Sequence, residues 1–202
     1  VGIICAGPCG LSALRSFELA EKQGGIIHEI VCFETQEDWG GLWNYSWRTG
    51  SDQYGDPVPN SMYRYLWSNG PKECLEFADY SFDKHFGKPI PSFPPREVLY
   101  DYIIGRVNQG NLKNKIKFNT RVTSTVFKDN KFEVSYQDKV NNKVLTENFD
   151  YVIVSSGHFS VPFIPEYSGM KSFPGRIMHS HDFRDAEEFR NKDVIVLGSS
   201  YS

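Results

Sequence analysis

Apolar and polar residues follow one another at the start of the chain in a pattern that predicts a strand, a turn, a helix and a second strand. The apolar run 1–4 passes directly into a glycine-rich turn, and the segment from Leu11 to Gln23 is compatible with a helix. A second apolar run, 29–34, ends on the acidic Glu34. This order is typical of the opening βαβ unit of a dinucleotide-binding fold, in which a pyrophosphate rests on backbone N–H groups at the helix N-terminus.

The middle of the chain has a weaker pattern. From Thr35 to Pro95 glycine, proline, asparagine and aromatic residues dominate, which is unusual in a compact domain unless the segment forms a functional surface. Apolar residues at 3–4 spacing then predict a helix from Pro95 to about Gly110. Alternating pieces joined by polar turns predict a small antiparallel meander. These pieces are 116–118, 122–128, 132–136 and 143–146.

The last quarter of the chain returns to apolar runs. Residues 151–154 predict a buried parallel strand, 185–191 a short helix and 194–197 a further strand. The order predicts an α/β fold: a Rossmann-like domain over 1–165, with a parallel sheet and an antiparallel meander insertion, then a linker and the incomplete start of a second Rossmann-like domain over 166–202. Both ends lie close to predicted strands, so we expect a fragment of a larger protein.

Composition narrows the classes of function. The 202 residues carry a formal net charge of −3, which favours neither a nucleic-acid surface nor a polybasic membrane anchor. No apolar run approaches the roughly 20 residues that span a bilayer. The four cysteines have no metal-type spacing, so reduced thiols and a cytoplasmic location are expected, with a Cys5–Cys9 redox pair as an alternative. His179 and His181 form an H-x-H pair, but no third ligand has a clear spacing, and we predict no metal site.

The glycine turn departs from the usual G-x-G-x-x-G pattern at one position. The chain reads C-A-G-P-C-G, so Cys5 stands where the first glycine is expected, while Gly7 and Gly10 are retained. Glu34 lies 24 residues after Gly10, close to the place of a carboxylate that binds a ribose hydroxyl. We therefore predict a dinucleotide site formed by Cys5, Gly7, Pro8, Cys9, Gly10 and Glu34. The side chain of Cys5 is expected to weaken retention of the cofactor without abolishing the fold.

Several separate segments together resemble the flavin-containing monooxygenase family. Gly40-Gly41-Leu42-Trp43 is similar to the loop that lies against the flavin in that family. Residues 173–183 match its F-x-G-x-x-x-H fingerprint and end on Phe183, where Baeyer–Villiger enzymes have tryptophan. The tyrosine-rich block 62–73 resembles the branch of bacterial trimethylamine monooxygenases. The resemblance covers the whole chain, which would be about the first half of a typical member.

The resemblance implies an FAD- and NADPH-dependent monooxygenase that oxygenates soft nucleophiles through a C4a-hydroperoxyflavin. The implied reaction converts trimethylamine, or a similar amine or sulfide, and O2 into trimethylamine N-oxide or its counterpart. Alternatives are a truncated flavin-binding remnant without turnover, a related N- or S-oxygenase, and a Baeyer–Villiger-type enzyme, against which Phe183 argues. A homodimer is possible. Aromatic rings could hold a cationic amine on approach. The candidates are Trp43, Trp47, Tyr63, Tyr65 and Trp67.

Site residues follow from the same resemblance. Asn69 is expected to be catalytic, near the reactive edge of the flavin, although the S-N-G-P sequence also explains it as a turn residue. Tyr201 is expected beside bound NADP+, although it could equally be a packed ring. Further FAD contacts are implied at Gly41, Leu42, Trp43, Asn69, Gly157 and His158. Contacts to NADPH are implied at Gly198, Ser199, Ser200, Tyr201 and Ser202.

Overall fold

The computed structural model describes residues 1–26 and 29–199, which form two compact units. The first unit comprises Val1–Asn44 and Trp67–Gly157, and the second comprises Tyr45–Leu66 and His158–Ser202. The chain therefore leaves the first unit twice, and the segment Tyr45–Leu66 packs with the C-terminal part, which the sequence pattern did not indicate. The division into an FAD-binding domain over 1–165 and an NADPH-binding start over 166–202 stays a prediction.

A four-stranded parallel sheet forms the centre of the first unit. Its order is β3-β2-β1-β7, with β1 at Gly2–Ile4, β2 at Val31–Phe33, β3 at Ile116–Lys117 and β7 at Val152–Val154. The predicted α/β fold with a parallel sheet and an antiparallel insertion is confirmed. One part of that prediction was wrong, because residues 116–118 do not belong to the meander. Ile116 instead pairs with β2, and Asn119 at φ 51° turns the chain before the meander begins.

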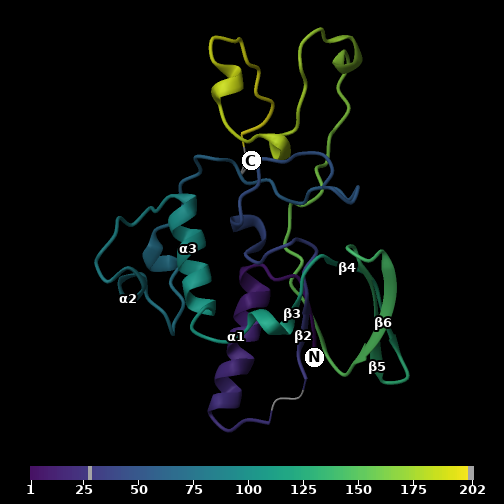
Figure 1. Ribbon diagram of the computed structural model, residues 1–202. Coiled ribbons are helices and arrows are strands. Elements are labelled where there is room, and N and C mark those ends of the chain that lie inside the picture. The colour runs from purple at the N-terminus through teal and green to yellow at the C-terminus, as the bar shows by residue number, and fades with distance from the viewer. Residues whose placement is uncertain (27–28, 200–202) are drawn as a thin grey trace. The chain divides into compact units, whose positions relative to one another are not determined.

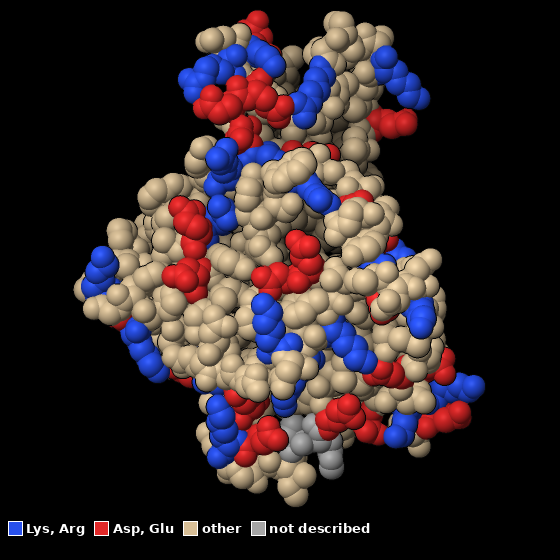
Figure 2. Space-filling view, in the orientation of Figure 1, with Lys and Arg blue, Asp and Glu red and all other residues tan. Residues whose placement is uncertain are grey.

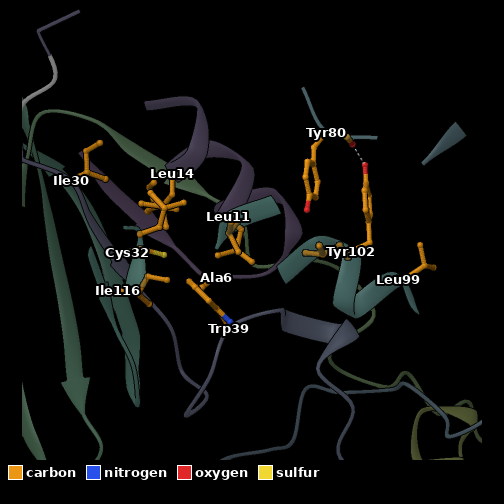
Figure 3. Packing of buried hydrophobic residues seen from close by; sticks show 14 of the residues in the cluster. Ala6, Leu11, Leu14, Ile30, Cys32, Trp39, Tyr80, Leu99, Tyr102 and Ile116 are labelled. Atoms are coloured by element: carbon orange, nitrogen blue, oxygen red, sulfur yellow. Dashed lines mark hydrogen bonds between the residues drawn. The ribbon is translucent and has the colours of Figure 1, made fainter. Parts of the chain in front are cut away.

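Successive residues of β2 point to opposite faces of the sheet, so the two faces of this strand pack in two different hydrophobic clusters. Cys32 joins a cluster with the helices α1 (Pro8–Lys22) and α3 (Arg96–Val107). Figure 3 shows Ala6, Leu11, Leu14 and Trp39 in this cluster, together with the Tyr102 hydroxyl, which donates to the carbonyl of Tyr80. Val31 and Phe33 point the other way, onto the meander. The short helix α2 (Phe82–Phe86) packs beside α3.

Helix α1 begins three residues earlier than the apolar pattern predicted. Pro8 occupies its first turn, where the missing proline N–H would have no partner within the helix anyway. The N-cap is Gly7, and the first turn carries no acidic residue. The backbone N–H groups of the first turn therefore have no partner within the helix.

The meander consists of β4 (Thr120–Lys128), β5 (Lys131–Asp138) and β6 (Lys143–Phe149), which pair antiparallel in that order. Asp129 and Asn130 form the first turn with φ of 50° and 60°, as the predicted polar turn requires. Figure 1 shows the meander and α1 on opposite sides of β2. Lys117 of β3 donates to the hydroxyl of Tyr136 at 3.2 Å, which adds a polar tie between the two sheets.

Among its described residues, the second unit contains short 3-10 turns and an isolated antiparallel bridge between Ser51 and Pro57. The turns are η4 (Met170–Ser172), η5 (Ser180–Asp182) and η6 (Glu187–Phe189). The helix predicted at 185–191 is reduced to η6. The strand predicted at 194–197 is wrong for this structure: these residues are exposed and belong to no sheet, because a strand needs a hydrogen-bonding neighbour. Three further 3-10 turns lie in the first unit. They are η1 (Gly41–Trp43), η2 (Lys72–Cys74) and η3 (Lys113–Lys115).

Candidate dinucleotide-binding site

The glycine turn joins β1 to α1 in a conformation that its sequence only partly suits. Cys5 adopts a φ of 80°, a left-handed conformation that glycine takes freely and other residues take at a cost. Its N–H donates to the carbonyl of Phe33 at 2.8 Å. A Cβ on Gly10 would lie 2.0 Å from the carbonyl oxygen of Cys5, so the helix can start this close to the strand only with glycine there.

The segment that opens η1 lies directly on this turn. Gly40 donates its N–H to the carbonyl of Ala6 at 2.9 Å, and a Cβ on Gly41 would lie 2.8 Å from the Cα of Gly7. The backbones at Gly7 and Gly41 therefore contact each other directly, with no side chain between them. The ring of Tyr100 on α3 closes the other side, since a Cβ on Gly40 would lie 2.6 Å from it. The turn and η1 form one backbone surface, with Leu42 exposed and Trp43 partly buried at its edge.

Glu34 is the acidic centre of the site. It follows β2 directly, and its side chain is fully buried, at 0% exposure. One carboxylate oxygen, Oε2, accepts the N–H of Ala6 at 2.6 Å and the thiol of Cys5 at 3.3 Å. The other, Oε1, accepts the N–H of Gln36 at 2.9 Å. Burial raises the pKa of Glu34, and the hydrogen bonds from Gln36 and Ala6 act against that rise.

Cys5 acts here as a hydrogen-bond donor. Burial, followed by the nearby charge of Glu34, raises the pKa of Cys5 to about 12, which keeps the thiol protonated at neutral pH. The thiol thus occupies one acceptor position of the Glu34 carboxylate. All four cysteines, including the partly buried Cys5 and the exposed Cys9, are free thiols.

The other predicted site residues are spread over both units. Asn69 is exposed on a turn of the first unit, where the hydroxyl of Ser68 donates to the carbonyl of Gly70 at 2.6 Å. Gly157 ends the first unit with a φ of 73°. His158, Gly198 and Ser199 belong to the second unit and are exposed. The predictions for Ser200, Tyr201 and Ser202 lie outside the described residues.

The aromatic residues proposed as a cation-holding wall are also divided between the units. Trp67 is exposed in the first unit. Trp47, Tyr63 and Tyr65 are exposed in the second, and the ring of Tyr63 lies 5.5 Å from that of Phe183. Tyr63 thus contacts the last residue of the fingerprint 173–183.

The structure adds residues that the sequence analysis missed. Ala6 contributes its backbone N–H to Glu34, Gly40 and Tyr100 shape the loop above the glycine turn, and Lys139 contacts the turn after β2. Gly40 was part of the loop that the resemblance indicated, but it was not among the predicted contacts. The backbone contribution of Ala6 carries no signal in a single sequence, since every non-proline residue has an N–H group.

The face of the molecule that Figure 2 shows has no concentration of one charge. Figure 2 shows Lys and Arg interspersed with Asp and Glu over the visible face. Within residues 1–26 and 29–199, no helix is both long and apolar enough to cross a membrane. In the same residues, His, Cys, Asp and Glu form no group of three that could hold a metal ion.

Comparison with known proteins places this geometry in a family. A relative from Pelagibacter sp. (strain HTCC7211) called trimethylamine monooxygenase is 80% identical over all 202 residues, which span 46% of its length. The solved structure of Tmm from the same strain matches with a TM-score of 0.97, over 99% of this chain and 46% of that one. S-allyl-L-cysteine S-oxygenase from Allium sativum, 29% identical, matches with a TM-score of 0.77 over 93% of this chain and 43% of its own.

The chain thus spans about half the length of the curated relatives it matches. The model of the family described as flavin-binding monooxygenase-like matches residues 1–202, from the glycine turn to the last residue. A family of that description implies a flavin cofactor, and the glycine turn with the buried Glu34 is the part of this chain suited to a dinucleotide. The chain belongs to the flavin-binding monooxygenase-like family.

Proposed function

We propose that this chain supplies the FAD-binding part of an NADPH-dependent monooxygenase that converts trimethylamine into trimethylamine N-oxide. The observation that carries the proposal is the juxtaposition of the glycine turn, the N-terminus of α1 and the buried carboxylate of Glu34. The trimethylamine monooxygenase from Pelagibacter sp. (strain HTCC7211), at 80% identity, supports the choice of substrate.

The residues present fit FAD in three ways. The N-terminus of α1 offers unpaired backbone N–H groups and has no acidic side chain in its first turn, which suits a pyrophosphate. Gly7 and Gly41, both buried, let the loop that opens η1 lie directly on the glycine turn with no side chain between them. Glu34 stands at the end of β2, where a carboxylate can accept a ribose hydroxyl.

FAD would supply the oxygen chemistry when bound, with NADPH as the source of reducing equivalents. The chain's own residues would bind the cofactor and orient the reacting groups. Gly40–Trp43 would fix one side of the cofactor by its contact with the glycine turn. The amide of Asn69 would donate and accept hydrogen bonds near the reaction without transferring a proton. A neutral amine needs no general base, because its nitrogen already presents a lone pair.

The direct test is an NADPH oxidation assay on the intact protein that carries these residues. Trimethylamine should accelerate NADPH consumption, and N-oxide should appear in proportion to the NADPH consumed. A dimethyl sulfide arm and a cyclic ketone arm identify the S-oxygenase and Baeyer–Villiger alternatives. NADPH loss that yields only hydrogen peroxide with every substrate would contradict the proposal.

The role of Asn69 has its own test. Asn69→Ala should retain bound flavin, because the glycine turn and Glu34 are unchanged, and should lose N-oxide formation by about 10²-fold or more. Asn114→Ala, another exposed asparagine of the first unit, serves as the matched control and should keep full activity. Unchanged N-oxide formation in Asn69→Ala would show that Asn69 is a turn residue only.

A further inference from the structure

Lys139 is an unusual residue in the first unit. It directly follows β5 in the turn that leads to β6, yet its exposure is only 6%. Lysine is almost never buried to this extent unless its ammonium group has partners. Its Nζ donates to the backbone carbonyl of Thr35 at 3.4 Å, across 104 residues of sequence. The meander therefore places a buried cation at the residue that follows Glu34.

The acceptor of this hydrogen bond is one end of a peptide group that also contacts Glu34. The carbonyl of Thr35 and the N–H of Gln36 belong to the same planar unit. That N–H donates to Oε1 of Glu34 at 2.9 Å. Two hydrogen bonds thus connect the Lys139 ammonium to the Glu34 carboxylate through the 35–36 peptide group. In such a chain of hydrogen bonds, each bond polarises and strengthens the next.

The same turn is tied to the start of the meander by its other backbone groups. The carbonyl of Gln36 accepts the N–H of Asn119 at 3.0 Å, and the carbonyl of Glu34 accepts that of Thr120 at 2.8 Å. Asn119 in turn accepts the backbone N–H of Lys139 at 2.9 Å. The segment 34–36 is therefore held by residues where the chain enters β4 and where it leaves β5, on the side of β2 opposite the glycine turn.

We infer that Lys139 is a positioning residue for Glu34: through the 35–36 peptide it fixes the direction in which the carboxylate presents its free acceptor capacity to a ribose hydroxyl of FAD. This role rests on the proposed function. It assigns the meander a task in cofactor binding, because the insertion supplies the cation that orients the acidic residue of the Rossmann-like unit.

The experiment measures FAD affinity of the flavin-stripped intact protein by fluorescence titration. Lys139→Met keeps most of the apolar stem and removes the ammonium, and it should weaken FAD binding about 5–10-fold. Lys139→Arg should recover most of the affinity. Lys143→Met, which removes an exposed lysine of β6, is the matched control and should bind FAD as the unchanged protein does. If Lys139→Met fails to fold, Lys139→Gln takes its place in every arm.

A double-mutant cycle separates positioning from general stability. In a Glu34→Gln background, Lys139→Met should have no further effect on FAD affinity, since the carboxylate it orients is gone. An equal loss in both backgrounds, or unchanged affinity in Lys139→Met, overturns the role of Lys139 and leaves the proposed function intact. Absence of saturable FAD binding by the unchanged protein overturns the proposed function and this role together.

Discussion

Two buried charges, Glu34 in the first unit and Arg184 in the second, are both held by backbone groups. Burial raises the pKa of Glu34 and lowers that of Arg184, as expected when each loses hydration. Arg184 donates from Nε to Arg48, from Nη1 to His181 and Phe183, and from Nη2 to Arg48 and Asn60, all of them backbone carbonyls.

The difference between the two lies in the hydrogen-bonding capacity that remains. A guanidinium has five N–H donors, and these five bonds of Arg184 use every one of them. A carboxylate offers about four acceptor positions. Glu34 accepts hydrogen bonds from the backbone N–H groups of Ala6 and Gln36 and from the thiol of Cys5, and the thiol is a weak donor. Because all five N–H donors of Arg184 are used within the chain, Arg184 has a structural role. Glu34 keeps hydrogen-bond acceptor capacity, which suits a ligand.

Of the substitutions predicted here, the removal of the Arg184 guanidinium should have the largest effect. Arg184→Met leaves the carbonyls of residues 48, 60 and 181 without this donor, and we expect a loss of about 3 kcal/mol in the free energy of unfolding. Urea denaturation of the intact protein measures this. Arg190→Met removes an exposed arginine that pairs with Glu187, and it should cost less than about 0.5 kcal/mol. Equal effects of the two changes would remove the contrast with Glu34.

Removal of the charge of Glu34, the residue proposed to bind the ribose, should have the next largest effect. Glu34→Gln keeps the size of the side chain and removes its charge, and FAD affinity should fall about 10–100-fold because a charged hydrogen bond is lost. Titration of the flavin-stripped protein measures the change. Glu37→Gln, three residues along on the surface, should leave the affinity unchanged. A Glu34→Gln protein that binds FAD normally would reduce Glu34 to a structural residue like Arg184.

The pH dependence of stability sharpens the same contrast. Because the folded-state pKa of Glu34 lies above its ordinary value of 4.5, the folded chain holds this proton more tightly than the unfolded chain. The contribution of Glu34 to stability is therefore greatest below pH 4.5 and falls as the pH rises through the folded-state pKa. Relative to the unchanged flavin-free protein, Glu34→Gln should gain stability across that window. A difference that stays constant with pH would contradict the raised pKa.

The smallest effect concerns Cys5. Cys5→Gly removes a side chain from a left-handed backbone position and should stabilise the chain by about 1 kcal/mol. It also removes the thiol from Oε2 of Glu34 and frees an acceptor position, so flavin occupancy of the purified protein should rise. Cys9→Gly would be a poor control because Cys9 lies within α1; Cys74→Ser, at an exposed cysteine, is the better one. Unchanged occupancy would show that the turn tolerates the thiol.

The sequence predicted the parts of the fold that have a local signature. The apolar runs located β1, β2 and β7, and the glycine turn with Glu34 identified the core of the candidate site. The two-residue β3 is too short to have a period of its own, and its partner β2 is far away in the sequence. The run at 194–197 has the composition of a strand, but composition cannot supply the neighbouring strand that it needs.

The contacts of Lys139 and Arg184 could not have been predicted for a related reason. Both side chains bind backbone carbonyls, and a carbonyl is present at every residue, so no sequence motif marks the acceptor. In the case of Lys139 the acceptor also lies 104 residues away. Glu34 could be proposed from the sequence because its position relative to Gly10 is set by one short βαβ unit.

The place of β7 in the sheet has a consequence for the synthesis of the protein. Gly2 of β1 pairs with Val31 on one side and with Val152, 150 residues further along the chain, on the other. At the roughly 5–20 residues per second of translation, the first strand waits about 8–30 s for its second neighbour. During that time the apolar β1 has one unpaired edge on the ribosome. Slowing translation before residue 152 should therefore lower the yield of folded protein, and a chaperone that shields strand edges should restore it.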